Sequence, residues 1–393
     1  MRYEAWVGIR YLFGRSKEKF ISIISLISVI GVATGVATLI VVIGVMSGFD
    51  TELRNRIIGT SSHIVVEKIG GLDQPQGVMD SLKGLEHVMA SAPFVNTQAL
   101  LIDKEKLFAL MIRGIDEKLE TQVTGIGKFI KHGSLDLSGN NIIIGKELAQ
   151  RFLVRVGDEV QLVSSPRVKA KAFKIAGIFS SGMYDYDANV AFMRLDKAQA
   201  LAQNPNIISG ISIKVDDVYK AHLIKKDIQA KLGFPYYTRT WMDLNRNLFD
   251  ALKLEKTAMF IILTLIVLVA ALNIGSTLIM MVMEKTKDIG ILKAIGATNK
   301  SIHIIFTIVG MAIGVIGTVF GAAGGLGLAY ILKTYQFIQL PQDIYYIDKL
   351  PVRVEGLDVL WIVLAALCIS LFATLYPAHH AARLNPGEAL RYE

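Results

Sequence analysis

The sequence predicts an α-helical membrane protein with four transmembrane helices and a large α+β domain between the first two. Hydrophobic residues make up 52% of the 393 residues and charged residues only 19%, whereas soluble domains carry roughly 25% charged residues. Four stretches also contain no Asp, Glu, Lys or Arg, and each reaches the roughly 20 residues that a helix needs to cross a bilayer.

The expected spans are residues 20–49, 257–283, 301–332 and 359–378. Basic residues precede the first one, as in a signal peptide, but its apolar run is far longer than the roughly 7–15 residues of a signal core. We therefore expect a retained helix. No Pro or Gly interrupts 50–58 or 241–249, so both segments are predicted to continue the first two spans as helical stalks.

The basic residues at the ends of the spans predict the topology. They gather in the N-terminal segment 1–19, in the loop 284–300 and in the tail 379–393, and are sparser in the longer loop 333–358. By the positive-inside rule, both termini and the loop 284–300 face the cytoplasm, and residues 50–256 lie outside it. The formal charge of +8 is then partly a topology signal, and no nucleic-acid partner is expected.

The region 50–256 reads as an α+β domain of short strands punctuated by turns. Its helical candidates are 146–152, 196–203 and 218–232, the last with lysines opposite an apolar face. Its strand candidates are 63–67, 107–112, 141–144, 159–163, 172–178, 189–193 and 210–215.

The sequence contains no recognisable catalytic or metal site. Residues 139–147 resemble a phosphate-binding loop, but Asn140 stands where that loop needs Gly and Glu147 where it needs Ser or Thr. Asp185 and Asp187 would share one face if they lie in a strand, and would belong to a polar loop if they lie in a turn, and we predict no catalysis there. The histidines are scattered, and the single Cys368 excludes internal disulfides and cysteine clusters. We predict no catalytic residue, no metal, no cofactor and no ATP hydrolysis by this chain itself.

Two features of the spans remain open to more than one interpretation. Small residues recur every three or four positions over 310–327, which favours close helix packing, either static or able to slide. No ionisable residue lies inside a span except His303 at an edge, which argues against an ion channel or ion-coupled transporter. The amphipathic loop 284–298 predicts a short helix ended by Gly296, either interfacial or docked on a partner.

This loop and the C-terminal sequence YPAHHAARLNPGEALRYE (376–393) resemble the permeases related to MacB and to the cell-division protein FtsX. The sequences GIRYL (8–12), IGVATGVA (30–37), MSGFDTEL (46–53) and ALRYE (389–393) look specifically like the LolC/LolE lipoprotein-releasing permeases. The resemblance covers essentially the whole chain and is weaker in the soluble region. It implies a MacB-like permease in a bacterial inner membrane.

The resemblance also implies partners and a mechanism. Two permease subunits, either identical copies or paralogues, would bind cytoplasmic LolD-type ABC ATPases. The complex would extract acylated lipoproteins from the outer leaflet of the inner membrane and hand them to a periplasmic LolA-type carrier. Because each acyl CH₂ moved from lipid to water costs about 0.8 kcal/mol, extraction needs an apolar receiving surface and an external energy source.

Candidate residues follow from the same resemblance. LolC-type members carry a Pro-rich Hook loop that recruits LolA, and the hairpin 164–171 here is short. It is either a reduced Hook or the mark of a LolE-like subunit that leaves docking to its partner. The candidates for carrier docking are Pro166 and Arg167. Those for the lipoprotein cavity are Val42, Met46, Phe49, Leu53, Met259 and Leu263. Those for ATPase coupling are Glu284, Lys285, Lys287, Asp288, Ile291, Leu292, Ala294, Ile295, Gly296 and Ala297.

Two other functions remain as alternatives. One is a MacB- or FtsX-like mechanotransmission permease for efflux or cell-wall hydrolase control. FtsX-like proteins usually have a smaller extracytoplasmic domain, and MacB carries a fused ATPase. The other is a membrane sensor or scaffold without transport, which predicts a signalling domain after the last span.

Overall fold

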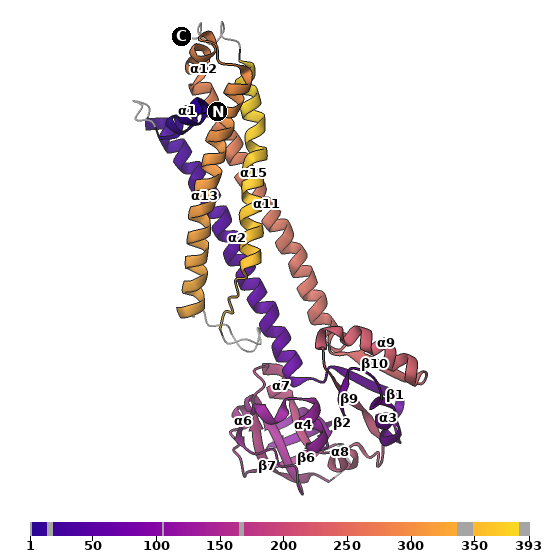
Figure 1. Cartoon of the computed structure of the whole chain (residues 1–393). Helices are drawn as coiled ribbons and strands as arrows, with labels where there is room; N and C mark the ends of the chain where they lie inside the picture. Colours follow the sequence, from indigo (N-terminus) through magenta and orange to yellow (C-terminus); the bar gives the residue numbers. More distant parts are fainter. Residues whose placement is uncertain (1, 14–18, 104–105, 165–168, 336–348, 385–393) are drawn as a thin grey trace. The chain divides into compact units, whose positions relative to one another are not determined.

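The computed structural model describes the chain except residues 1, 14–18, 104–105, 165–168, 336–348 and 385–393 (Figure 1). It divides into two compact units. The helical unit comprises the chain up to Asp50 and most of it from Leu252 onward, and the sheet unit comprises Thr51–Ala251. Two long helices, α2 (Lys19–Thr60) and α11 (Arg246–Glu284), contribute residues to both units.

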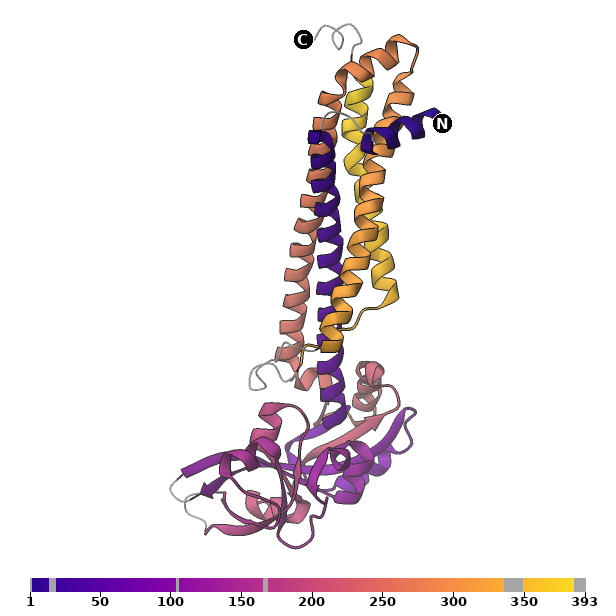
Figure 2. The ribbon, with the colours of Figure 1, turned by 90° about the vertical axis from the view of Figure 1, so that its left-hand side faces the viewer.

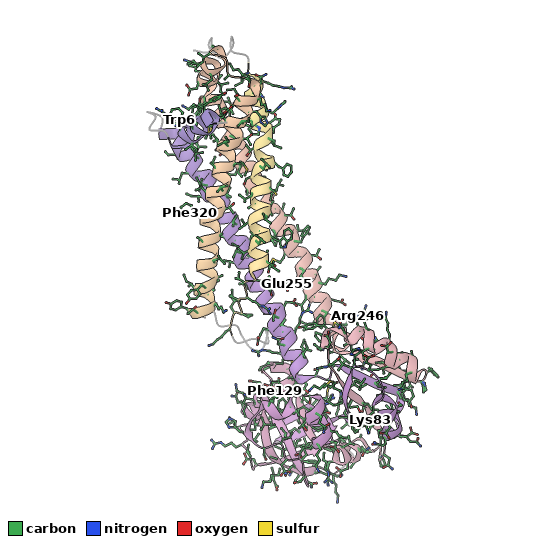
Figure 3. All side chains as sticks on the ribbon, in the orientation of Figure 1. Trp6, Lys83, Phe129, Arg246, Glu255 and Phe320 are labelled. Atoms are coloured by element: carbon green, nitrogen blue, oxygen red, sulfur yellow. The ribbon has the colours of Figure 1, made fainter. Side chains whose placement is uncertain are left out.

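The helical unit also contains α1 (Arg2–Phe13), α12 (Thr286–Ala294), α13 (Asn299–Tyr335) and α15 (Gly356–Arg383). Among the described residues, four helices are long and apolar enough to cross a membrane: α2, α11, α13 and α15. Figure 2 shows them running alongside one another. Large apolar side chains such as Phe320 on α13, which is 67% exposed, point away from the helices (Figure 3), as expected for surfaces that meet lipid or another membrane subunit.

Glycines of α13 let two neighbouring helices approach it closely. A Cβ at Gly321 would lie 2.6 Å from the carbonyl oxygen of Ala33 and 2.8 Å from the Cβ of Val36, both on α2. On another face, a Cβ at Gly314 would lie 2.4 Å from Ser370 on α15. The small residues predicted at 310–327 therefore serve packing within this chain.

The described part of the sheet unit forms a ten-stranded sheet in the order β10-β1-β9-β2-β3-β8-β5-β7-β4, with β6 pairing β2 and β7. Strands β3 and β8 are parallel, as are β5 and β7. The strands are β1 (Ile64–Leu72), β2 (Val88–Asp103), β3 (Lys106–Ile115), β4 (Ile130–Gly133), β5 (Asn141–Gly145), β6 (Glu159–Val163), β7 (Lys171–Phe179), β8 (Val190–Arg194), β9 (Ile208–Val215) and β10 (Tyr236–Thr240).

Short helices cover this sheet and complete its core. They are α3 (Pro75–Leu82), α4 (Glu117–Val123), α5 (Ile126–Phe129), α6 (Lys146–Phe152), α7 (Tyr184–Asn189), α8 (Leu195–Ala202), the 3₁₀ helix η1 (Val218–Lys220), α9 (Ala221–Leu232) and α10 (Trp241–Leu244). Strand β5 shows that both sheet faces are covered. Ile142 and Ile144 lie in one hydrophobic cluster and Ile143 in another, all with no exposed surface, because successive side chains point to opposite faces.

Each expected strand and helix of this region overlaps an observed element, but β4, β10, α3, α4 and α5 were not predicted, and three further differences concern α7, η1 and β2. Asn189 ends α7 instead of starting a strand. The expected helix 218–232 begins as the 3₁₀ helix η1. The longest strand, β2, was not predicted. It contains Pro93, which lacks an N–H for the ladder and argues against a central strand. Its pairing with β3 begins only at the next residue, Phe94.

The second stalk was predicted as one helix from 241 onward, and this is wrong at its start. Helix α10 ends at Leu244, and α11 begins at Arg246. A capping box starts α10, in which Thr240 and Asp243 exchange side-chain to backbone hydrogen bonds. The side-chain amide of Asn245 donates to the Trp241 carbonyl at 2.7 Å, which satisfies the end of this single turn. The first stalk is continuous, since α2 runs unbroken to Thr60.

Candidate functional site

The segment that resembles a phosphate loop is a closed structural element. It forms a turn at Gly139, with φ +61°, followed by β5 and α6. A Cβ at Gly145 would lie 2.0 Å from the carbonyl oxygen of Asp187. The backbone of α7 therefore packs directly against Gly145.

Asp185 and Asp187 lie on the short helix α7, and neither on a strand nor in a polar loop. Asp187 is 2% exposed and accepts hydrogen bonds from the Ser181 hydroxyl at 2.6 Å and the Ser180 hydroxyl at 3.2 Å. Burial raises the pKa of Asp187. Asp185 is exposed, so the two carboxylates do not share a site. Across the described ranges, no group of three His, Cys, Asp or Glu residues is placed to hold a metal ion.

Helix α12 is the predicted short amphipathic helix of the loop 284–300, and one face of it is anchored in the helical unit. Ile289 is fully buried in the hydrophobic cluster of that unit, and Leu292 packs against the cluster. The Lys293 ammonium donates to the carbonyl oxygens of Ala382 and Leu384, each at 2.7 Å. This helix is therefore tied to the end of α15.

The C-terminus of α12 is a Schellman motif. The N–H of Ala297 donates to the Leu292 carbonyl at 2.9 Å, and that of Gly296 to the Lys293 carbonyl at 3.0 Å. Gly296 adopts φ +104°, a conformation that disfavours residues with a Cβ. Gly296 thus ends the helix as predicted, and its role in the structure is to shape the turn.

The opposite face of α12 is open. Ile291 is 52% exposed and Ile295 is 77% exposed. Among the other coupling candidates, Glu284, Lys287, Ala294 and Gly296 are exposed, and Lys285, Asp288, Leu292 and Ala297 are half-buried. An anchored helix that presents two bare isoleucines has the form of a docking element.

Helix α1 lies beside α12 in the helical unit. The Lys285 ammonium sits 5.9 Å from the centre of the Tyr11 ring. Burial, reinforced by the negative charge of Asp288, raises the pKa of Tyr11 to about 12. Residues 285–294 therefore contact α1 at Tyr11 and the end of α15 through Lys293.

The candidate cavity residues occupy two kinds of position. Val42, Met46 and Phe49 on α2, and Met259 and Leu263 on α11, are half-buried. Leu53 is only 4% exposed and offers little surface to a ligand in this conformation. The segment before α15 covers part of α2, because the Arg353 N–H donates to the Gly44 carbonyl at 2.8 Å. A Cβ at Gly48 would clash with the Pro351 carbonyl.

A nearby apolar groove of about 390 Å³ lies between α2 and α11. It includes none of the six candidates; on α2 it lies on earlier turns than they do, and on α11 its lining residues begin at Ile262, next to Leu263. Near one end the Ser28 hydroxyl donates to Asn273 at 2.9 Å, and beyond the other the Lys256 ammonium pairs with Asp50 at 3.1 Å. The groove is lined by Gly31, Thr34, Gly35, Thr38, Ile262, Leu265, Ile266, Val269, Ala270 and Asn273.

Comparison with known proteins matches both parts of the chain. A MacB-like periplasmic core domain matches residues 25–231, more than half of the chain, and an FtsX-like permease C-terminal domain matches residues 260–386. A LolC lipoprotein-releasing system transmembrane protein of Xylella fastidiosa (strain Temecula1) is 36% identical over 98% of both chains. The chain belongs to the LolC/LolE family.

Other LolC/LolE relatives match over similar lengths. A Neisseria meningitidis LolC is 32% identical over 99% of both chains, and a Haemophilus influenzae LolE is 32% identical over 98% of both. Among solved structures, the periplasmic region of MacB from Actinobacillus actinomycetemcomitans aligns with a TM-score of 0.35 and 14% identity, covering 49% of this chain and 94% of that one. Similarity to both LolC and LolE at like identity leaves the choice between the two subunit types open.

Membership of the LolC/LolE family confirms three predictions. The chain has four long apolar helices with a MacB-like periplasmic α+β domain between the first two. It is a multi-pass permease of the lipoprotein-releasing system. It is the transmembrane component and not an ATPase. The sheet unit is therefore the periplasmic domain of a LolC/LolE permease.

Some features of this LolC/LolE permease were beyond sequence reasoning. Asn273 is the one sequence signal for the contact between α2 and α11, because it places a side-chain amide inside the predicted second span. Lys256 precedes the second span, and the sequence does not indicate that it pairs with Asp50 on α2. The carrier-docking candidates Pro166 and Arg167 lie outside the described residues.

Proposed function

We propose that this chain is the permease subunit through which ATP hydrolysis by a cytoplasmic partner extracts acylated lipoproteins from the outer leaflet of the inner membrane. The lipoproteins then pass to a periplasmic carrier. The observation that most supports this is helix α12, which is fixed to α15 through Lys293 and exposes Ile291 and Ile295. In this proposal those two side chains enter a groove on a LolD-type ATPase.

The energetics require such a partner. Each acyl CH₂ that leaves the bilayer costs about 0.8 kcal/mol, so an acyl chain with many such groups stays in the membrane unless work is done on it. The one segment that resembles a phosphate-binding loop departs from that motif at Asn140 and Glu147. In this proposal the work is done on α12 and transmitted through α15 and the helices packed against α13.

An apolar receiving surface would lower the cost of extraction. We place it on the facing parts of α2 and α11, where Val42, Met46 and Met259 are half-buried and the apolar groove begins. Half-buried side chains suit this role, because they offer apolar surface without being locked into a core. A second permease copy or a paralogue would close the surface from the other side.

The proposed topology places α1, α12 and both termini in the cytoplasm. This rests on the basic residues flanking the spans and on the contacts that bring α1, α12 and the end of α15 together. It puts the coupling helix on the ATPase side and the MacB-like domain in the periplasm, where a LolA-type carrier would receive the lipoprotein.

Depletion of this protein in its own cells tests the proposed function. Lipoproteins bound for the outer membrane should accumulate in the inner membrane, as measured by density separation of the two membranes followed by immunoblotting. Re-expression of the wild-type chain should restore the normal distribution. Unchanged arrival of lipoproteins at the outer membrane during full depletion would refute the proposal.

A further inference from the structure

The sheet unit contains a pocket that belongs to neither of the sites described above. It is an open hollow of about 680 Å³ formed by strand β4, helix α6 with the residues after it, and the end of β7 (α6 and β7 are labelled in Figure 1). All of these elements lie in the same compact unit.

The charged side chains on the pocket wall are all basic. Lys131, His132, Lys146 and Arg155 line it, and no Asp or Glu does. Within the described ranges, no carboxylate forms an ion pair with Lys131, His132 or Arg155. The carboxylate partner of Lys146 is Glu147, at the long distance of 3.9 Å. Like charges gathered around a concave surface raise the local potential and attract anions.

Of the described acidic residues, the one nearest to Arg155 along the chain bonds to its backbone and forms no ion pair with its guanidinium. Asp158 accepts a hydrogen bond from the backbone N–H of Arg155 at 2.7 Å. It therefore shapes the loop, while the Arg155 guanidinium stays exposed beside the pocket.

The pocket also has apolar surface. Ile178 and Ala149 form buried parts of its lining, and Leu153 projects at its rim with 88% of its surface exposed. Leu153 ends α6 in a left-handed conformation, with φ +54°. A bare leucine beside several cations suits a ligand that carries both carboxylates and apolar groups, and a bare inorganic anion would leave this surface unused.

One wall of the pocket is the edge of a sheet. Strand β4 ends the strand order and pairs with β7 alone. Its residues Lys131, His132 and Gly133 are exposed. An open edge offers backbone groups to an added strand, and side chains beside it then select the sequence.

We propose that this pocket binds an acidic, extended segment of a partner polypeptide. The segment adds to the free edge of β4, its carboxylates pair with Lys131, Lys146 and Arg155, and an apolar side chain covers Leu153. The site is separate from α12 and from the α2–α11 groove, so it is independent of the proposed function in lipoprotein release.

The test uses the purified full-length protein in detergent and a fluorescein-labelled hexaglutamate peptide, with binding followed by fluorescence anisotropy. The double variant Lys131→Glu/Arg155→Glu should weaken binding by at least about tenfold, since losing two charge-assisted contacts exceeds the roughly 1.4 kcal/mol that a tenfold change represents. The matched control is Lys226→Glu on α9, an exposed lysine outside the pocket, and it should bind hexaglutamate like the wild type.

A peptide of opposite charge distinguishes a lost contact from a misfolded variant. The double variant should gain affinity for labelled hexalysine, which the wild-type pocket should not bind. Four outcomes overturn the proposal: no binding of hexaglutamate by the wild type, equal loss in Lys226→Glu, displacement of the peptide by equimolar inorganic phosphate, or binding of the wild type to anionic lipid vesicles that depends on Lys131 and Arg155 in place of peptide binding.

Discussion

The helical unit and the sheet unit use apolar residues in opposite ways. In the sheet unit, Ile142, Ile143 and Ile144 are all fully buried. In the helical unit, only 6% of the most apolar stretch of α11 is buried, whereas 50% of the corresponding stretch of α13 is buried. The sheet unit therefore buries its apolar residues, whereas the helical unit buries them mainly along α13 and leaves many apolar side chains of its other long helices exposed.

This difference shows which solvent each unit is built for. In water, burying a large apolar side chain stabilises the fold by about 1.5–3 kcal/mol relative to leaving it exposed, so a sheet with two covered faces is favoured. In lipid that driving force is missing, and close backbone packing through small residues replaces it. The glycines of α13 supply this packing. The exposed faces of α11 and α2 are then available to lipid, a second subunit or an acyl chain.

The largest expected effect is the difference in stability loss between two Ile→Ala substitutions, one in each unit. Ile144→Ala removes a fully buried side chain and should destabilise the sheet unit by about 2–5 kcal/mol, through lost burial and the cavity left behind. Ile261→Ala, at a side chain 55% exposed on α11, should change stability by less than about 0.5 kcal/mol. Hydrogen exchange of peptides from each unit measures both, and equal losses would contradict the comparison.

The next effect tests packing by glycine in the helical unit. Gly321→Leu forces a side chain against Ala33 and Val36, so we expect a cost of at least about 1–3 kcal/mol from overpacking. The matched control is Gly324→Leu, three residues along the same helix, where a Cβ meets nothing within 4 Å. Thermal unfolding in detergent should show a lower midpoint for Gly321→Leu alone. A matching drop in the control would show that any bulky residue is harmful on α13.

The smallest effect is a pH dependence confined to the sheet unit. Partial burial lowers the pKa of His63 below its ordinary value of 6.5, and the Lys214 charge adds to this. The unfolded chain then binds the proton more readily than the folded one. The contribution of His63 to stability is therefore constant well above pH 6.5 and falls as the pH drops through that value.

Comparison with His63→Gln isolates this contribution, since the shifted carboxylates are common to both proteins. Between neutral and mildly acidic pH, the stability of the sheet unit should fall more steeply in the wild type than in His63→Gln. Parallel pH profiles would show that His63 is not held in its neutral form.

The features that the sequence predicted well depend on local signals. The spans follow from uncharged runs, and α12 with its end at Gly296 follows from a short amphipathic pattern and a glycine at φ +104°. The features that it missed depend on partners distant in the chain. Strand β2 is one of them: it contains Pro93, which is in register with Ile211 of β9, while its pairing with β3 starts only at Phe94.

The candidate site residues also divide into those that a local pattern predicts and those that depend on contacts distant in the chain. Ile291 and Ile295 are exposed on α12, and an amphipathic pattern already pointed to them. The exposure of the cavity candidates was not predictable. Leu53 is buried, while the groove lies among residues such as Thr38 and Leu265. These positions depend on how α2 lies against α11, and contacts such as Ser28–Asn273 and Asp50–Lys256 join residues far apart in the chain.

Release of a purified lipoprotein from proteoliposomes tests the central claim most directly. The vesicles contain this permease with its partner permease and ATPase, and a soluble periplasmic carrier is added outside. With ATP, the wild-type complex should transfer lipoprotein to the carrier, and Ile295→Leu should do the same because it keeps an apolar contact. Ile295→Asp should abolish transfer while the complex stays folded. Undiminished ATP-driven transfer by Ile295→Asp would contradict the role of α12, and transfer that needs no ATP would contradict the account as a whole.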